Sequence, residues 1–334
     1  MKAFARTLVA GALLAIGGLG GWWIGRARPT APPHGTAPAD AAPARPADAA
    51  LQDVAPPLSL PNTHVHRVPN TATGRGYEVW VDLPPSYFEN DRPYPVVFTT
   101  DADFGFPLIR SLRRRVGAKG RNIEDFVLVG LSYGIGEQSM PSKRRDYTPT
   151  DPFSRAQTNI APYDRDSTYG QADAYRDYIE RDVFPLIAKR YRVDMQRKVY
   201  IGHSLGGLFG SHVLLTKPAM FSHYILGSPS LWFDRRTIFE TEAAYAAAHR
   251  DLPANVMLYI GSYETYGDGP RYFKTVDMVG DTRGFEQRMR ARKYPGLRIG
   301  IDILPDQDHL TVFPEMATRG LLWALPGTGP YTSG

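Results

Sequence analysis

The stretch Tyr200-Ile201-Gly202-His203-Ser204-Leu205-Gly206-Gly207 follows an apolar, β-prone run and precedes small, helix-compatible residues. Its Gly-x-Ser-x-Gly pattern matches a nucleophile elbow, in which a tight strand-to-helix turn presents a serine hydroxyl above a parallel sheet. The two glycines leave room for that turn. The helix that follows directs its free N–H groups toward an oxyanion formed beside Ser204. The pattern predicts a serine hydrolase, and the alternative is a glycine-rich turn with an incidental serine.

Strand-like and helix-like segments alternate along most of the chain. This alternation predicts an α/β fold of the α/β-hydrolase type, with a mostly parallel central sheet flanked by helices. The predicted strands cover residues 63–67, 77–83, 95–100, 125–131, 198–201, 223–226, 255–260 and 297–304. The predicted helices cover residues 107–116, 172–190, 205–215, 237–250, 281–293 and 313–323. Residues 137–170 are polar and proline-containing, and we expect an irregular loop there.

The N-terminus has the pattern of an exported protein. Lys2 and Arg6 precede an apolar run over residues 8–25, which approaches the roughly 20 residues of a spanning helix and lacks a small-residue cleavage site. The pattern favours an uncleaved membrane anchor over a cleaved signal peptide. The predicted domains are a signal or anchor (1–27), a disordered Ala/Pro-rich linker (28–61) and a catalytic domain (62–334). We expect a periplasmic protein tethered to the inner membrane, or one secreted after cleavage.

Composition excludes several classes of protein. The formal net charge of +5 is spread along the 334 residues without a basic stripe, so no nucleic-acid partner is expected. The absence of cysteine excludes disulfides, zinc–thiolate sites and a cysteine nucleophile. His64 and His66 would share one face of a strand, but two histidines without a third ligand are typical of an edge strand. No metal or cofactor is predicted; the expected partner is a small-molecule ester, with membrane contact through the N-terminal segment only.

A serine nucleophile needs a base, usually oriented by an acid. In this fold the order along the chain is serine, acid, histidine, each after a strand. His309 follows the last predicted strand and is the predicted base. The other histidines considered lie where they do not readily face the serine: His203, His212, His223 and His249. Glu264 follows the preceding strand and is the predicted acid, with Asp268, Asp277 or no acid at all as alternatives.

The oxyanion requires two preorganised N–H donors. We predict the backbone N–H of Leu205 as the first and that of Asp103, in the loop after the strand at 95–100, as the second. Five arginines in two runs would also suit an anionic ligand, although such charge runs are usually solvated faces. They are Arg113, Arg114, Arg115, Arg144 and Arg145.

Four stretches, together with the Asp308-His309 pair, resemble the putative-esterase branch of the α/β-hydrolases over about residues 80–325. The stretches are residues 94–101 (YPVVFTTD), 145–150 (RDYTPT), 202–207 (GHSLGG) and 228–232 (SPSLW). This branch includes esterase D-like enzymes, ferri-siderophore esterases, feruloyl esterases and mycolyltransferase antigens.

The resemblance implies Ser204 as nucleophile, His309 as base, Glu264 as acid and Asp103 as the second oxyanion donor. Family members often have glycine where this chain has Ala102. The function expected is ester cleavage through an acyl-serine, with an enterobactin-type siderophore ester as the most specific candidate substrate. An acyltransferase, a peptidase of the same fold and a non-enzymatic binding protein are the alternatives.

Overall fold

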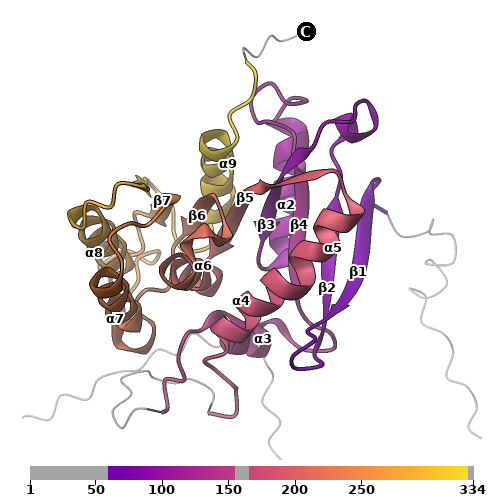
Figure 1. The fold of residues 1–334 in the computed structure, drawn as a ribbon. Helices are drawn as coiled ribbons and strands as arrows, with labels where there is room; N and C mark the ends of the chain where they lie inside the picture. The colour runs from indigo at the N-terminus through magenta and orange to yellow at the C-terminus, as the bar shows by residue number, and fades with distance from the viewer. Residues whose placement is uncertain (1–58, 155–164, 330–334) are drawn as a thin grey trace, which may run out of the picture. The chain divides into compact units, whose positions relative to one another are not determined.

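A single eight-stranded sheet forms the centre of the fold in the computed structural model, which describes residues 59–154 and 165–329 (Figure 1). The strands are β1 (Thr63–Pro69), β2 (Gly76–Asp82), β3 (Tyr94–Thr99), β4 (Val127–Gly134), β5 (Val193–His203), β6 (His223–Gly227), β7 (Ala254–Gly261) and β8 (Leu297–Leu304). Their order in the sheet is β1-β2-β4-β3-β5-β6-β7-β8. The β1–β2 and β2–β4 pairs are antiparallel and all the other pairs are parallel, so the predicted, mostly parallel sheet is confirmed.

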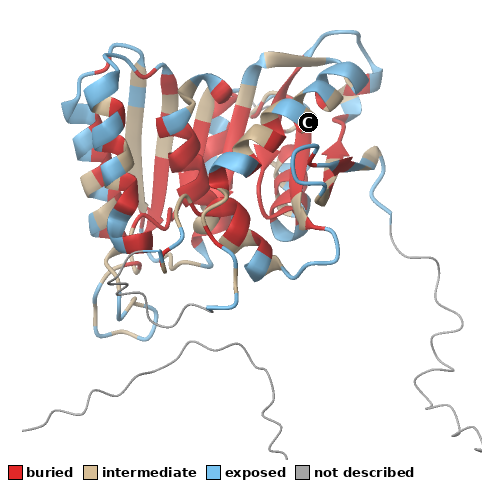
Figure 2. Cartoon of the chain, turned by 60° about the horizontal axis from the view of Figure 1, so that its bottom comes forward, coloured by how far each residue is buried: buried red, intermediate tan, exposed pale blue. Residues whose placement is uncertain are grey.

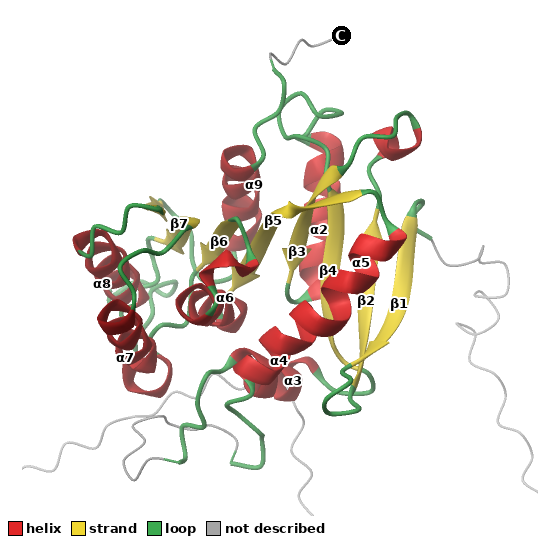
Figure 3. Cartoon of the chain, in the orientation of Figure 1, coloured by secondary structure: helices red, strands yellow, loops and turns green. Residues whose placement is uncertain are grey.

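Helices cover both faces of this sheet (Figure 3). They are α2 (Ala102–Arg115), α3 (Ser139–Tyr147), α4 (Ala172–Tyr178), α5 (Phe184–Arg190), α6 (Leu205–Thr216), α7 (Phe233–Ala248), α8 (Met278–Ala291) and α9 (Val312–Ala324). A single π turn, Ile179–Val183, joins α4 to α5, and two short 3-10 turns lie at Pro85–Phe88 and Pro218–Met220.

The core consists of two main apolar layers, one on each face of the sheet. Alternate residues of a strand point to opposite faces, so Val97 of β3 packs in a cluster with Phe106 of α2 and Met316 of α9. Its neighbour Phe98 packs on the opposite face with Phe209 of α6. Strands buried on both faces become continuously apolar, as β3 is. The buried strands between partly exposed helices are visible in Figure 2.

Two predictions about local structure were wrong. Helix α2 begins at Ala102, whereas the sequence predicted a start at Pro107. Proline favours the first helical position, but here Pro107 lies inside the helix. Helix α3 occupies part of the segment expected to be irregular. Its last residues, Arg145 and Tyr147, are buried, so tertiary contacts stabilise a helix that its own sequence pattern does not reveal.

The N-terminal predictions concern residues that are mostly outside the described part of the chain. The predicted signal or anchor (1–27) lies wholly outside it, and the predicted linker (28–61) overlaps it only at residues 59–61. Within residues 59–154 and 165–329, every helix is too short or too polar to cross a lipid bilayer.

Candidate active site

The site lies where the direction of the sheet order changes. From β3 the chain proceeds to β4 on one side, and from β5 it proceeds to β6 on the other side. Loops at such a point diverge and leave a crevice at the carboxyl ends of the strands. The loop after β3 begins at Thr100, and Ser204 directly follows β5. The sheet topology therefore brings both segments to one crevice.

Ser204 occupies a strained elbow between β5 and α6. Its φ of 58° and ψ of −118° are unfavourable for a residue with a side chain. The turn is held by the Ser204 N–H, which donates to the Gly227 carbonyl at 3.0 Å. A Cβ atom at Gly202 would lie 2.4 Å from the Gly206 carbonyl oxygen, and one at Gly206 would lie 2.4 Å from Thr100 Oγ1. The glycine spacing seen in the sequence therefore has a direct steric cause.

Ser204, His309 and Glu264 form one hydrogen-bonded chain. His309 Nε2 lies 2.9 Å from Ser204 Oγ, and its Nδ1 lies 2.6 Å from Glu264 Oε2. A carboxylate oxygen accepts, so Nδ1 carries the proton and Nε2 of the neutral ring accepts from the serine hydroxyl. The His309 side chain is 24% exposed, whereas Glu264 is fully buried. This geometry suits a base that receives the serine proton.

Glu264 is fixed by two further donors. Its Oε1 accepts from the Gly261 N–H at 2.8 Å and from Ser228 Oγ at 2.5 Å. The two alternative acids lie elsewhere: Asp268 is exposed, and Asp277 caps α8 by accepting from the Gly280 N–H at 2.8 Å. The structure therefore brings Glu264, and neither aspartate, to His309.

The segment after β6 braces the site in a way that our sequence reasoning missed. Ser228 bonds to the acid, as described above, and the Ser230 N–H donates to the Ser204 carbonyl at 3.1 Å. The Ser230 hydroxyl oxygen also lies 3.4 Å from Ser204 Oγ. The only sequence signal was the presence of two serines in the 228–232 stretch that resembles the family.

The two predicted oxyanion donors lie in the first turns of two helices. Leu205 is the first residue of α6 and Asp103 is the second residue of α2. The first four N–H groups of a helix have no partner within it. The two helix starts adjoin, because a Cβ atom at Gly206 would lie 3.2 Å from Asp101 Oδ2. The arrangement suits the binding of a developing negative charge beside Ser204.

With this geometry in place, comparison with known proteins decides the family. Residues 70–297 match the family described as Putative esterase. The protein belongs to this family. It is 28% identical to the ferri-bacillibactin esterase BesA of Bacillus subtilis over 83% of this chain and 94% of the relative. It is also 28% identical to the siderophore triacetylfusarinine C esterase of Aspergillus fumigatus, over 63% of this chain and 71% of the relative.

Solved structures show the same fold. The BES protein of Bacillus cereus superimposes with a TM-score of 0.67 at 23% identity, covering 80% of this chain and 97% of that one. The resemblance to the esterase branch of the α/β-hydrolases is thus confirmed, and the protein is a carboxylic-ester hydrolase.

In this esterase-family protein, two of the other histidines considered, His212 and His203, have surroundings that do not suit a catalytic base. His212 Nε2 lies 2.8 Å from Oδ1 of Asp173 in the neighbouring helix α4. His203 lies beside the predicted base, with its ring centroid 4.7 Å from that of His309. Burial, and then the nearby charges of His309 and Lys143, lower the pKa of His203 well below its usual value. His203 is therefore a neutral, buried neighbour of the predicted base.

The suggestion that five arginines attract an anionic ligand was wrong for two of them. Arg113 is 1% exposed and pairs with Asp82. Arg145 is buried and donates to Asp146 at 2.8 Å and to Glu137 at 2.7 Å. Both guanidinium charges are already neutralised by carboxylates. Neither side chain is therefore part of a solvated face or available to an anionic ligand. The cause is burial, which requires a charged group to be paired.

The paired histidines of β1 do not form a metal site with neighbouring ligands. His66 Nε2 lies 2.6 Å from the Tyr191 hydroxyl. Within residues 59–154 and 165–329, no group of three or more His, Cys, Asp or Glu residues is placed to hold a metal ion.

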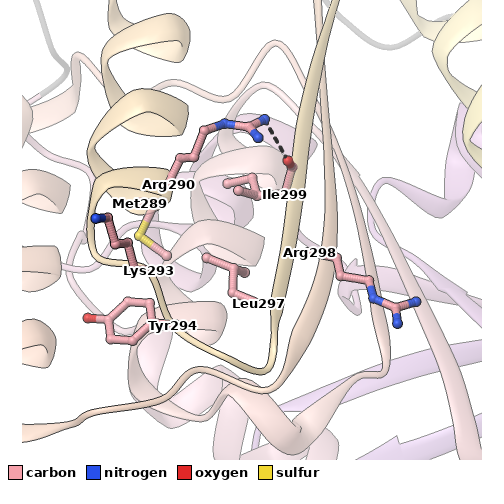
Figure 4. A pocket seen from close by; sticks show the side chains of 7 residues that line it. All are labelled: Met289, Arg290, Lys293, Tyr294, Leu297, Arg298 and Ile299. Carbon is pink, nitrogen blue, oxygen red and sulfur yellow. Dashed lines mark hydrogen bonds between the residues drawn. The ribbon is translucent and has the colours of Figure 1, made fainter.

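A cavity of about 270 Å³ lies far from the triad, at the start of β8 (Figure 4). It is lined by residues that include Met289, Leu297 and Ile299, and Arg290 donates across it to the Ile299 carbonyl at 3.0 Å. Because His309 follows the opposite end of β8, this cavity takes no part in the site.

Proposed function

We propose that this protein hydrolyses the ester bonds of a siderophore through an acyl intermediate on Ser204. The observation that carries the proposal is the bonded chain from Ser204 through His309 to the buried Glu264. Support for the substrate class comes from the relatives, which are named as esterases of ferri-bacillibactin and of triacetylfusarinine C.

The first half of the reaction forms the acyl-enzyme. Ser204 Oγ attacks the ester carbonyl carbon while its proton passes to His309 Nε2. The carbonyl oxygen becomes an oxyanion and accepts hydrogen bonds from the Leu205 and Asp103 N–H groups. The bond to the leaving oxygen then breaks, and His309 returns the proton to the departing alcohol. Glu264 keeps the ring in the required tautomer and stabilises the imidazolium.

The second half releases the acid. Water takes the place of the alcohol and attacks the acyl carbon while its proton passes to His309. When the second tetrahedral intermediate collapses, the Ser204 oxygen leaves and recovers a proton from the imidazolium. The net change is consumption of one ester and one water, with formation of one acid and one alcohol.

The test compares the full-length protein with Ser204→Ala and His309→Ala, using Ser111→Ala as a matched control on the exposed side of α2. We expect the first two variants to lose at least ~10³-fold in kcat on p-nitrophenyl butyrate and the control to match wild type. Chromatography should then show ring opening of ferric or iron-free enterobactin by wild type and the control, and none by the two active-site variants. No hydrolysis, together with no fluorophosphonate labelling of Ser204, would overturn the enzyme proposal.

Two other outcomes would revise only part of the proposal. Hydrolysis of the nitrophenyl ester without any cleavage of the siderophore would remove the substrate class and keep the serine esterase. Faster transfer of the acyl group to an added sugar or lipid alcohol than to water would favour the acyltransferase alternative, which uses the same residues.

We also propose that the esterase is exported and tethered by residues 1–27, with 28–61 as spacer and 62–334 as catalytic domain. The support is the basic start and apolar run at the N-terminus. Fractionation of cells expressing the full-length chain should place the protein in the inner-membrane fraction, accessible to protease from the periplasm. Deletion of residues 2–25 should leave it in the cytoplasm, and membrane-free wild-type protein of reduced mass would favour cleavage.

A further inference from the structure

Asp101 connects β3 to α2 and directly precedes the predicted oxyanion segment. Its φ of 54° and ψ of 54° are left-handed, which is costly for a residue other than glycine. The residue is 1% exposed. Such a conformation persists only where the surroundings hold it. The contacts of Asp101 therefore decide how the Asp103 N–H is presented.

Three groups from two other elements hold Asp101. Lys143 of α3 places Nζ 2.8 Å from Asp101 Oδ1, and the Tyr133 hydroxyl donates to the same oxygen at 2.7 Å. The backbone N–H of Asp101 donates to the Tyr147 hydroxyl at 3.4 Å. Tyr133 also lies 3.0 Å from Asp103 Oδ1, so it joins both ends of the turn.

The Tyr133 hydroxyl is suited to remain a donor. Burial, followed by the charges of Asp101 and Asp103, raises the pKa of Tyr133 far above its ordinary value. It cannot supply a positive charge, however. Among the groups bonded to Asp101, the cation is Lys143, whose side chain is only 13% exposed.

The Asp101 carboxylate poses an electrostatic problem for the reaction. Its Oδ2 has no hydrogen-bond partner among the described residues. A Cβ atom at Gly206 would lie 3.2 Å from this oxygen, so it faces the turn that also holds the Leu205 N–H. A bare negative charge here would repel an oxyanion formed at that N–H. Burial makes the repulsion stronger than it would be in water.

We infer that Lys143 is a positioning residue for the oxyanion site: it holds Asp101 in its left-handed turn and neutralises the carboxylate beside the developing oxyanion. The inference rests on the proposed function, because it concerns the transition state of ester hydrolysis. Helix α3 thereby has a role in catalysis without touching substrate. The role predicts a loss in kcat with little change in KM, since the bound ester has no oxyanion and the negative charge develops only during the reaction.

The experiment is a double-mutant cycle in the full-length protein, with Lys143→Met, Asp101→Asn and the double variant. Lys217→Met is the control, because Lys217 is also paired with a carboxylate, that of Glu180, away from the site. Kinetics on p-nitrophenyl butyrate are combined with inhibition by phenylboronic acid, whose serine adduct mimics the tetrahedral intermediate.

We expect Lys143→Met to lower kcat about 10- to 100-fold, less than direct removal of an oxyanion donor, with KM within about threefold. Affinity for phenylboronic acid should fall by a similar factor. The kcat of the double variant should lie within about fivefold of that of Asp101→Asn, because without the carboxylate charge the cation is no longer needed. The control should behave as wild type.

Two results would overturn the inference: a kcat of Lys143→Met within threefold of the control, or an equal loss in the Asp101→Asn background, which would reduce Lys143 to a packing role. If Lys143→Met does not fold, Lys143→Gln removes the same charge and keeps a polar side chain, and an unchanged kcat in that variant would overturn the inference. Wild-type activity separates the two proposals. An inactive wild type overturns both the proposed ester hydrolysis and the role of Lys143. An active wild type whose Lys143 variants do not show the expected losses overturns the role of Lys143 alone.

Discussion

The buried carboxylate of Glu264 and the ring of His309 meet at 2.6 Å although 45 residues separate them in the chain. Glu264 is delivered by the loop after β7 and His309 by the loop after β8, two neighbouring parallel strands. Parallel strands end at the same edge of a sheet, so both loops lie at the edge that also carries Ser204. The other hydrogen bonds of the Glu264 carboxylate come from Gly261 and Ser228 to Oε1, which leaves Oε2 directed at the histidine.

This relationship predicts the effect of Glu264→Gln. Glutamine keeps the size of the side chain but lacks the negative charge that stabilises the imidazolium, and its amide can select the wrong tautomer of His309. We expect kcat on p-nitrophenyl butyrate to fall by about 10²- to 10⁴-fold with KM little changed. Asp268→Asn, at an exposed position in the same loop, should stay within twofold. A Glu264→Gln enzyme of near wild-type kcat would instead favour a serine–histidine pair that needs no acid.

Asp308 should support the His309 loop. Its Oδ1 accepts from the Leu310 and Thr311 N–H groups at 3.0 Å each, and its Oδ2 accepts from Arg271 at 2.7 Å. Burial alone would raise the pKa of Asp308, but these donors outweigh it and lower the pKa to about 2. We expect Asp308→Ala to reduce kcat/KM about tenfold by loosening the loop, and Asp308→Asn to retain more activity because it can still accept from the backbone.

The pH dependence of this contribution has a definite sign. A depressed carboxyl pKa stabilises the fold above the unfolded value of about 3.9, and the stabilisation is lost as the pH falls toward 2. The difference in unfolding free energy between wild type and Asp308→Asn should be constant above about pH 5 and shrink between about pH 4 and 2. Urea titrations across this range measure it, and a difference that grows on acidification would contradict the assignment.

His203 should make the fold sensitive to mild acid. Its pKa is lowered well below the usual value, chiefly by burial, so below about pH 6.5 the unfolded chain binds a proton that the folded protein does not. The free energy of unfolding should therefore decrease as the pH is lowered, by up to about 1.4 kcal/mol per pH unit from this residue. His203→Gln should flatten the dependence between pH 6.5 and 5, whereas Ser111→Ala, which changes no titratable group, should keep the wild-type slope. Equal slopes in all three proteins would refute the explanation.

Arg113 and Arg114 are neighbours with opposite expected importance. Arg113 is buried, pairs with Asp82 and donates to the Phe126 carbonyl at 2.7 Å, whereas Arg114 is exposed. Arg113→Met leaves a buried carboxylate short of a partner and should reduce the free energy of unfolding by about 3 kcal/mol or more. Arg114→Met should change it by less than about 0.5 kcal/mol. Urea unfolding measures the two losses, and equal losses in the two variants would show that the pair between Arg113 and Asp82 adds little to stability.

Much of the fold was predictable because its signals are local. The alternation of apolar strands with amphipathic helices depends on residues a few positions apart, and it predicted the parallel sheet that the structure contains. The elbow around Ser204 was recognisable for a similar reason, since its glycines are required by contacts within and beside a single turn. The order of Ser204, Glu264 and His309 along the chain restricted the candidates to a few loop residues.

Only the tertiary structure decided which of these candidates meet. Ser204 and His309 are 105 residues apart, and no local pattern encodes the 2.9 Å between them. Helix α3 and the pairing of Lys143 with Asp101 were not predictable for the same reason, because packing of this helix against α4, α6 and β4 stabilises them. The sequence alone determined the kind of fold and the residues able to perform the chemistry. Long-range packing decided which of those residues meet and which charges surround them. This packing depends on the strand order of the sheet, which brings distant loops together.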